Sequence, residues 1–280
     1  MKHSLKSDDR NAAKAKIAEL SVQGPFLKRL ESENANITWK SIIYAVPRGI
    51  LSWATRAITD SLVTPSNLAK WKKVIDPSCK LCKQTNNVTL KGTLHHILSN
   101  CPLMLDQYQC RHDGVLDFLT STVKMQNRDN PSTKIYADNE HHKINGGTIP
   151  SNIVPTGQRP DLVIVETLEE STKISLVELT VPFERNIDAA IKRKKSRYTP
   201  LQLDIERSGE SCDLMTLEIE CRGYIDTKNK SVIKKILSKF KIKQQTNILS
   251  KISKISLLGS YTIYNAREEM QWTNGAYISP

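Results

Sequence analysis

The chain has 280 residues, with 41 lysines and arginines against 29 aspartates and glutamates, which gives a formal net charge of +12 at pH 7 and a pI near 9.4. This positive balance favours a polyanionic partner, of which nucleic acid is the usual one. No apolar run is long enough to cross a bilayer, and no apolar segment follows the first residues as in a signal peptide. We therefore expect no membrane contact and a location in the cytosol or nucleus.

The first 70 residues predict a series of helices. Residues 12–20 are rich in side chains with high helix propensity. Apolar residues at helical spacing predict two further helices, over 39–44 and 51–58. After a break, Ser66 is a suitable N-cap for a helix over 67–74.

Cysteine and histidine concentrate in the next segment. Reducing conditions disfavour disulfides, so metal binding is the leading explanation for six cysteines. Cys79, Cys82, His96 and Cys101 follow the pattern C-x2-C-x13-H-x4-C, which supplies four ligands suited to tetrahedral Zn²⁺. We predict a closed zinc knuckle that folds a small lobe and carries out no chemistry.

Other side chains leave the zinc ligands partly open. His95 is adjacent to His96 and could replace it, although His95 leaves a longer reach to Cys101. Cys110 and His112 are close enough in sequence to be spare ligands. The alternative to zinc is a set of buried structural cysteines with incidental histidines, which the gathering of the motif in one short polar segment disfavours.

The second half of the chain predicts strands followed by helices. Residues 126–158 are polar and contain several prolines and glycines, which indicates a loop-rich segment. Strand patterns at 162–165 and 174–181 flank a polar turn at 166–172, so they predict an antiparallel hairpin.

Further elements follow the hairpin. A helix is predicted over 186–198 and is expected to stop before Pro200. A third strand is predicted over 216–224. An amphipathic helix with lysines on its polar face is predicted over 232–240.

The hairpin brings two acidic side chains together. A hairpin that is symmetric about Glu169 and Glu170 places Asp161 opposite Glu178, with Cβ atoms within ~5 Å. Two carboxylates at that distance repel unless a positive charge lies between them, and Mg²⁺ prefers such oxygen ligands. We therefore predict a magnesium site at Asp161 and Glu178; the alternative is a polar residue at the strand entry and an exposed strand face.

The helix that follows the hairpin carries basic residues on one face. Lys194 and Arg197 are three residues apart, and the small side chains of Ala189 and Ala190 would let this helix pack near the sheet. Lys194 is the candidate for positioning the attacking water, and Arg197 for holding a phosphate. Together with a metal-activated nucleophile these roles fit phosphodiester hydrolysis, whereas the alternative is an ordinary solvated helix face.

These motifs occur in an order that resembles a known family. The matching segments are NLAKW at 67–71, HILSNC at 96–101, RHD at 111–113, RPD at 159–161, ELTVP at 178–182, and the basic pair Lys194 and Arg197 before Tyr198. In these segments the chain resembles the C-terminal part of non-LTR retrotransposon proteins that carry a restriction-like endonuclease, of the site-specific kind that inserts into ribosomal DNA. The resemblance spans roughly residues 35–275.

The resemblance implies an α+β protein whose residues 116–280 form a PD-(D/E)xK nuclease domain with an α/β core, after a helical linker (1–70) and a CCHC zinc knuckle (71–115). It implies magnesium-dependent nicking of target DNA, which primes reverse transcription of the element's RNA. Target DNA and element RNA are then the expected partners, and the nucleus is the expected location after synthesis in the cytoplasm. The family's paired acids correspond to Asp161 and Glu178, and its paired basic residues to Lys194 and Arg197.

Some features depart from the family's pattern. The wider nuclease group has a lysine two residues after the second acid, where this chain has Thr180. The family that this chain resembles carries that lysine on the next helix, as this chain does with Lys194. Arg197 stands where lysine is commoner, and the hairpin is longer than usual. The polymerase half is missing, since IYADN at 135–139 lacks the second aspartate of a reverse-transcriptase motif. The alternative function is therefore a non-catalytic, zinc-containing nucleic-acid-binding remnant of a retroelement.

Overall fold

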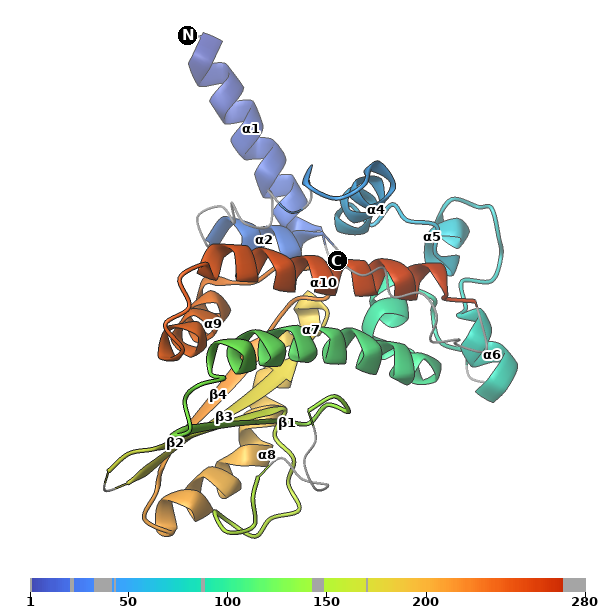
Figure 1. The fold of residues 1–280 in the computed structure, drawn as a ribbon. Coiled ribbons are helices and arrows are strands. Elements are labelled where there is room, and N and C mark those ends of the chain that lie inside the picture. The colour runs from blue at the N-terminus through green and yellow to red at the C-terminus, as the bar shows by residue number, and fades with distance from the viewer. Residues whose placement is uncertain are drawn as a thin grey trace. The chain divides into compact units, whose positions relative to one another are not determined.

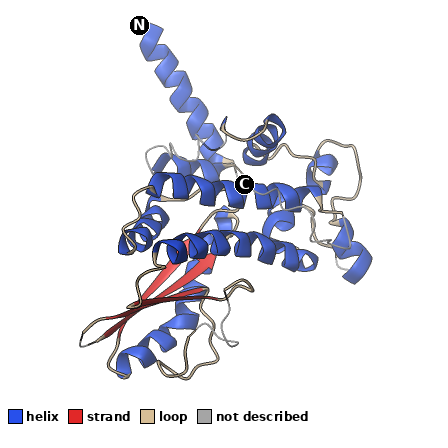
Figure 2. Cartoon of the chain, in the orientation of Figure 1, coloured by secondary structure: helices blue, strands red, loops and turns tan. Residues whose placement is uncertain are grey.

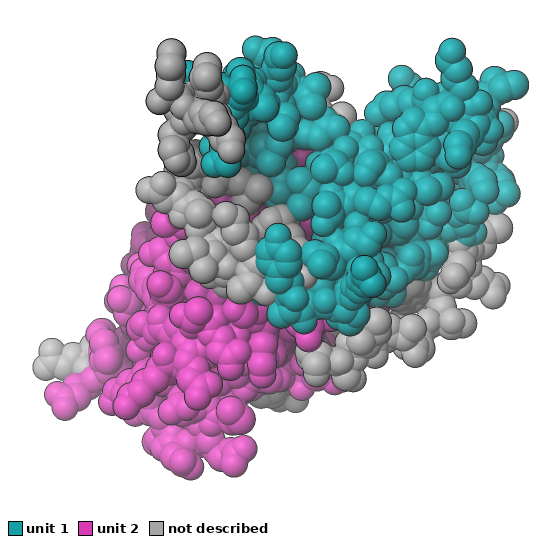
Figure 3. All heavy atoms as spheres, turned by 90° about the horizontal axis from the view of Figure 1, so that it is seen from above, with its two compact units in different colours: residues 1–104, 261–275 teal, residues 105–260, 276–280 magenta. Residues whose placement is uncertain are grey.

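The structure is a computed structural model that describes residues 2–20, 23–32, 42, 44–86, 89–142, 149–169 and 171–268. The chain divides into two compact units, residues 1–104 with 261–275 and residues 105–260 with 276–280, which Figure 3 colours separately. The first is a helical unit, and the second is built on a sheet. Among the described helices, none combines the length and the apolar character that a membrane span requires.

The helical unit is made of short elements joined by loops. Its elements are α1 (Lys2–Glu19), α2 (Gly24–Ser32), α4 (Arg48–Ile58), α5 (Pro65–Lys70), α6 (Lys80–Asn86), the π-helical turn η1 (His96–Asn100), the 3-10 turn η2 (Pro102–Met104) and the end of α10 (Gln245–Asn265) (Figure 1). The buried face of α4 recurs at helical spacing and consists of Ile50, Trp53, Ala54 and Ala57. The ring of Trp53 meets that of Tyr261 edge-on, with centroids 5.7 Å apart.

Of the four helices predicted in this unit, those over 12–20 and 51–58 are confirmed. α1 covers residues 12–19 of the helix predicted over 12–20, and α4 contains the helix predicted over 51–58. Of the helix predicted over 39–44, residues 39–41 and 43 lie outside the described residues.

The prediction of Ser66 as an N-cap is wrong. Thr64 caps α5, because its hydroxyl accepts a hydrogen bond from the backbone N–H of Asn67 at 3.2 Å. Pro65 then occupies the first helical position, where its missing N–H costs nothing. α5 also ends at Lys70, earlier than predicted.

The sheet unit contains strands β1 (Thr133–Ala137), β2 (Leu162–Thr167), β3 (Thr172–Thr180) and β4 (Ser211–Glu218), and helical elements α7 (Leu105–Gln126), η3 (Glu184–Asn186), α8 (Ile187–Arg207), α9 (Thr227–Lys239) and most of α10. The strand order is β1-β2-β3-β4; β1–β2 and β2–β3 are antiparallel, and β3–β4 is parallel. Figure 2 shows these strands among the helices. A mixed sheet with helices is compatible with the predicted α+β class.

The predicted hairpin is confirmed, and its register is the symmetric one. Leu162 pairs with Val177 and Thr167 pairs with Thr172. Both strands run further into the polar turn than predicted, because β3 is also paired on its other edge, where Lys173 is aligned with Ser211. Of the predicted hairpin tip, Glu170 lies outside the described residues.

Helix α8 covers one face of the sheet. A core cluster joins its buried side chains to β2, β3 and β4; it consists of Ile149, Val163, Val165, Ile174, Leu176, Tyr198, Leu201, Ile205 and Cys212. α7 contacts β1 and β3 and lies on the side of the sheet away from α8 (Figure 1). Because β2 and β3 are covered on both faces, they read as nearly continuous apolar runs.

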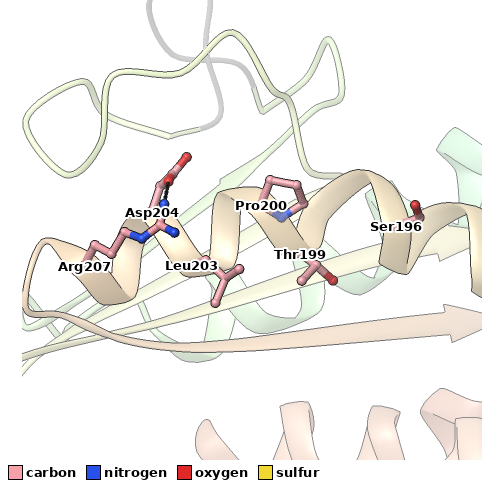
Figure 4. A pocket seen from close by; sticks show the side chains of 6 residues that line it. All are labelled: Ser196, Thr199, Pro200, Leu203, Asp204 and Arg207. Atoms are coloured by element: carbon pink, nitrogen blue, oxygen red, sulfur yellow. Dashed lines mark hydrogen bonds and ion pairs between the residues drawn. The ribbon is translucent and has the colours of Figure 1, made fainter.

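The prediction that the helix stops before Pro200 is wrong. α8 continues to Arg207 with Pro200 inside it, although an interior proline costs about 3 kcal/mol. Pro200 is exposed and lines a shallow surface hollow together with Leu203 (Figure 4). Leu201 and Ile205 remain buried against the sheet, so the apolar face of the helix continues past the proline.

Other elements differ from the predictions in their bounds. β1 lies inside the segment predicted as loop-rich, and it forms because all of its residues pair with β2, from Thr133 with Glu166 to Ala137 with Leu162. The strand predicted over 216–224 is wrong beyond residue 218, because β4 begins earlier, at Ser211, and ends at Glu218. α9 confirms the predicted amphipathic helix. The predicted boundary at residue 115 falls within α7, and the division into three domains stays a prediction.

Candidate zinc centre and carboxylate site

The first two cysteines of the predicted knuckle are positioned by a β-bridge and by the start of helix α6. Cys79 directly precedes α6, and Cys82 lies in its first turn. An isolated β-bridge pairs Ser78 with Lys91, and the backbone N–H of Cys79 donates to the carbonyl of Leu90 at 2.7 Å. The bridge holds the CxxC turn in place.

A second turn presents the remaining ligands. His96 begins the π-helical turn η1, and Cys101 follows its end. The backbone N–H of His96 donates to the hydroxyl of Thr93 at 3.1 Å, which fixes the start of the turn. In the described residues, the cluster contains His96 and not His95, and neither Cys110 nor His112 belongs to it.

The four side chains form one buried cluster that could hold a metal ion. Their ligand atoms all lie within 4.8 Å of one another. Cys82 Sγ lies 3.4 Å from His96 Nε2 and 3.6 Å from Cys101 Sγ. A hydrogen bond with Cys101 lowers the pKa of Cys79, and the same contact raises the pKa of Cys101. Thiolate and imidazole ligands in this number are compatible with zinc.

The acidic pair closes the open end of the hairpin. The carboxylate of Glu178 accepts a hydrogen bond from the backbone N–H of Asp161 at 3.1 Å, and Asp161 Oδ2 accepts one from the N–H of Leu179 at 2.7 Å. Side chains thus continue the ladder beyond Leu162 and Val177, where the backbone pairing ends. This exchange fixes both carboxylates against the sheet.

Lys194 from α8 bridges the two carboxylates. Its Nζ lies 2.5 Å from Glu178 Oε2 and 3.2 Å from Asp161 Oδ2. Glu178 is fully buried, while the side chains of Asp161 and Lys194 are 13% and 16% exposed. The two carboxylates therefore share one cation and open toward solvent on the Asp161 side.

The environment separates the pKa values of the two acids. Burial raises the pKa of Glu178 to about 7. The negative charge of Asp161 raises this pKa further, and the positive charge of Lys194 lowers it only in part. Burial alone would raise the pKa of Asp161 as well, but His112 and Lys194 outweigh burial and lower that pKa to about 2. One ionised and one partly protonated carboxyl group is a pattern found where acids and bases are assigned different tasks.

Sequence reasoning did not connect His112 with this site. Its Nε2 lies 3.5 Å from Asp161 Oδ1, and its Nδ1 lies 2.9 Å from Asp113 Oδ1. Burial lowers the pKa of His112, but the two carboxylates outweigh burial and raise it to about 9. The only earlier sign was the motif match RHD at 111–113, which carried no spatial information.

The pKa of His112 predicts a pH dependence of stability. The folded-state pKa of about 9 lies above the ordinary value of 6.5, so the folded chain holds this proton more tightly than the unfolded chain. The resulting stability is complete below pH 6.5 and is lost as pH rises towards 9, by at most about 3 kcal/mol. Urea unfolding in magnesium-free buffer at pH 6 and pH 9 should show this loss in the wild type and a smaller one in His112→Gln. Equal losses in both would contradict the prediction.

Arg197 is not brought to the acids. Its side chain is exposed, and its guanidinium lies over the Tyr198 ring, 5.3 Å from the centroid. Within the described part of the chain, no ion pair joins it to Asp161 or Glu178. Tyr198 itself donates its hydroxyl proton to the carbonyl of Arg159 at 2.9 Å, which ties the RPD segment to α8.

No protein-family model matches the chain, and none of the curated proteins matches it.

Proposed function

We propose that this chain is a magnesium-dependent endonuclease that cuts DNA by phosphodiester hydrolysis. The observation that supports it most is the arrangement of Asp161, Glu178 and Lys194. One carboxylate directly before β2 and one on β3 share one ammonium group from the following helix. Together with the sequence motifs, this arrangement supports a PD-(D/E)xK type of nuclease, with the lysine supplied by the helix in place of Thr180.

The donor set fits magnesium. Asp161 and Glu178 offer hard carboxylate oxygens, which Mg²⁺ prefers. The ammonium of Lys194 between them indicates that the pair accommodates positive charge. The partial exposure of Asp161 leaves room for the water molecules that Mg²⁺ retains. Asp161 and Glu178 would hold the ion, which when bound activates water and neutralises charge on the phosphate.

Two basic side chains of the protein would orient the water and stabilise the negative charge of the phosphate. Lys194 holds a positive charge beside the acids, because Asp161 and Glu178 raise its pKa against the effect of burial. It is thereby suited to orient an attacking water and to offset negative charge that develops on the phosphate. Arg197, exposed on the same helix, is available for a phosphate further along the DNA.

The wider role rests on the sequence resemblance. We propose that the nick primes reverse transcription of a retroelement's RNA in the nucleus. The buried cluster of Cys79, Cys82, His96 and Cys101 would bind structural zinc and complete a knuckle. The net charge of +12 suits target DNA and element RNA as partners.

The position of Arg197 favours a second candidate. A remnant that binds nucleic acid without cutting it does not need Arg197 near the two carboxylates, and Arg197 is exposed to solvent over the Tyr198 ring. Such a protein would keep its charge and its zinc knuckle.

Replacement of Asp161 by asparagine is expected to remove nicking while leaving DNA binding intact. The amide keeps the size of the side chain but loses the charge that holds the ion, so the rate should fall at least ~100-fold, or about 2.7 kcal/mol of transition-state stabilisation. The measurement is conversion of supercoiled plasmid to the open circle with Mg²⁺, beside binding of the same DNA.

Asp204→Asn is the matched control, since Asp204 is an exposed carboxylate on α8 paired with Arg207 and remote in sequence from the acids. It should nick like the wild type. A wild-type protein that binds DNA and never nicks it in Mg²⁺ supports the remnant, and equal nicking by wild type and Asp161→Asn removes these acids from the reaction.

A further inference from the structure

A chain of contacts leads from helix α7 to Asp161. Gln109 Nε2 donates to Asp113 Oδ1 at 2.6 Å, and the same oxygen lies 2.9 Å from His112 Nδ1. The backbone carbonyl of Asp113 accepts a further hydrogen bond from Asn139 Nδ2 at 3.2 Å. These contacts fix the imidazole ring, whose other nitrogen faces Asp161.

The two oxygens of Asp161 are in different situations. Oδ2 accepts hydrogen bonds from the Leu179 N–H and from Lys194. Oδ1 faces His112 Nε2 at 3.5 Å, a longer, ionic contact. In the described part of the chain no other hydrogen bond or ion pair to Oδ1 is present, so this oxygen keeps lone pairs for a further ligand.

We propose that His112, held by Asp113, is a positioning residue that sets the plane of the Asp161 carboxylate and directs its Oδ1 toward the divalent cation. The inference rests on the proposed function, since it assigns a role in the same site. Because the carboxylate can rotate about its bond to Cβ, contacts at one oxygen leave its plane partly free. A contact at each oxygen restricts that rotation.

The effect should be felt in the metal requirement. Carboxylates that bind metal are themselves held by neighbouring groups, and loss of such a neighbour costs ~10–100-fold in metal affinity or activity. His112 does not itself touch the ion or the DNA in this proposal. It acts through Asp161 alone.

Two substitutions at one position separate hydrogen bonding from packing. His112→Leu fills a similar volume and offers no donor, whereas His112→Gln keeps a terminal N–H near the place of the imidazole Nε2. Asp113→Asn keeps volume and removes the charge that holds the ring, so it is the second variant should the leucine variant fold poorly. Circular dichroism and thermal melting report folding of each variant.

The full-length chain is titrated in two ways. Nicking of supercoiled plasmid is followed against Mg²⁺ concentration, and Mn²⁺ binding is followed without DNA by the loss of the free-ion electron paramagnetic resonance signal. We expect the half-saturating concentration of either ion to rise ~10–100-fold in His112→Leu. It should rise clearly less in His112→Gln and by an intermediate amount in Asp113→Asn.

The outcomes distinguish this inference from the proposed function. Unchanged metal titrations in folded His112→Leu and Asp113→Asn, with normal nicking by the wild type, overturn the positioning role and leave the nuclease standing. A defect in His112→Gln as large as that in His112→Leu also overturns the role. Both proposals are overturned if the wild-type chain does not nick DNA and if its Mn²⁺ binding is the same as that of Asp161→Asn.

Discussion

Removal of one cysteine from the buried Cys-Cys-His-Cys cluster is expected to unfold the small lobe around it. Cys82 is the position to change, because its sulfur contacts both His96 and Cys101. Zinc in such a site contributes ~10–16 kcal/mol of apparent binding free energy to the folded state, which exceeds what a few buried side chains can replace. Cys82→Ser should lose the metal and expose this segment to proteases.

Native mass spectrometry counts the zinc, and limited proteolysis reports whether residues 71–104 are folded. A strong chelator added to the wild type should reproduce the effect of Cys82→Ser. Cys110→Ser is the control, since Cys110 is half-buried in α7 and lies outside the cluster. A wild-type protein without bound zinc, or a Cys82→Ser variant as resistant to protease as the wild type, would show that the cluster is not a zinc knuckle.

Features set by local chemistry could be predicted from the sequence. The CxxC pair and the HxxxxC pair each lie within one or two turns of chain, so their spacing already carried the geometry of the cluster. The hairpin register followed from symmetry about a polar tip, and the structure has that register. Short apolar runs rich in β-branched residues likewise identified β2 and β3, and helical periodicity identified α9.

Features that depend on tertiary contacts could not be predicted from the sequence. Pro200 was read as a helix stop, but burial of Leu201 and Ile205 on the sheet keeps the helix going. β1 has little strand pattern of its own and is made by pairing with β2. His112 reaches Asp161 only because α7 crosses the sheet, and no local spacing relates the two residues.

Tertiary contacts also explain why Lys194 reaches the two carboxylates and Arg197 does not. Both were expected on one helical face, and they are three residues apart on α8. The direction of each side chain depends on what surrounds it: Lys194 turns to two buried carboxylates, while Arg197 lies over the exposed edge near Tyr198. Helical spacing can bring two side chains to neighbouring positions but does not choose their partners.

Replacement of Lys194 by methionine is expected to lower both stability and activity. Methionine keeps the length of the side chain and removes the only cation that an ion pair joins to both Asp161 and Glu178 in the described part of the chain. Loss of one partner from a buried ionic group typically costs ~3–5 kcal/mol. Loss of a charge that faces the reacting phosphate typically costs a further ~10²–10³-fold in rate.

Magnesium should separate these two effects. If the carboxylates bind the ion, Mg²⁺ replaces the missing positive charge, so the melting temperature of Lys194→Met should rise with Mg²⁺ more than that of the wild type. Nicking should stay low, because the ion does not restore the group that orients the water. Lys195→Met is the matched control: Lys195 is the exposed neighbour on the same helix, and its loss should change neither property greatly.

Two results would contradict this account of the site. A Lys194→Met protein as stable as the wild type without Mg²⁺ would mean that the bridging ammonium does not hold the acid pair together. A variant whose melting temperature is insensitive to Mg²⁺, while the wild type nicks DNA, would place the catalytic ion away from Asp161 and Glu178. The strength of the test lies in the burial of Glu178, since a fully buried carboxylate without a cation cannot be compensated by solvent.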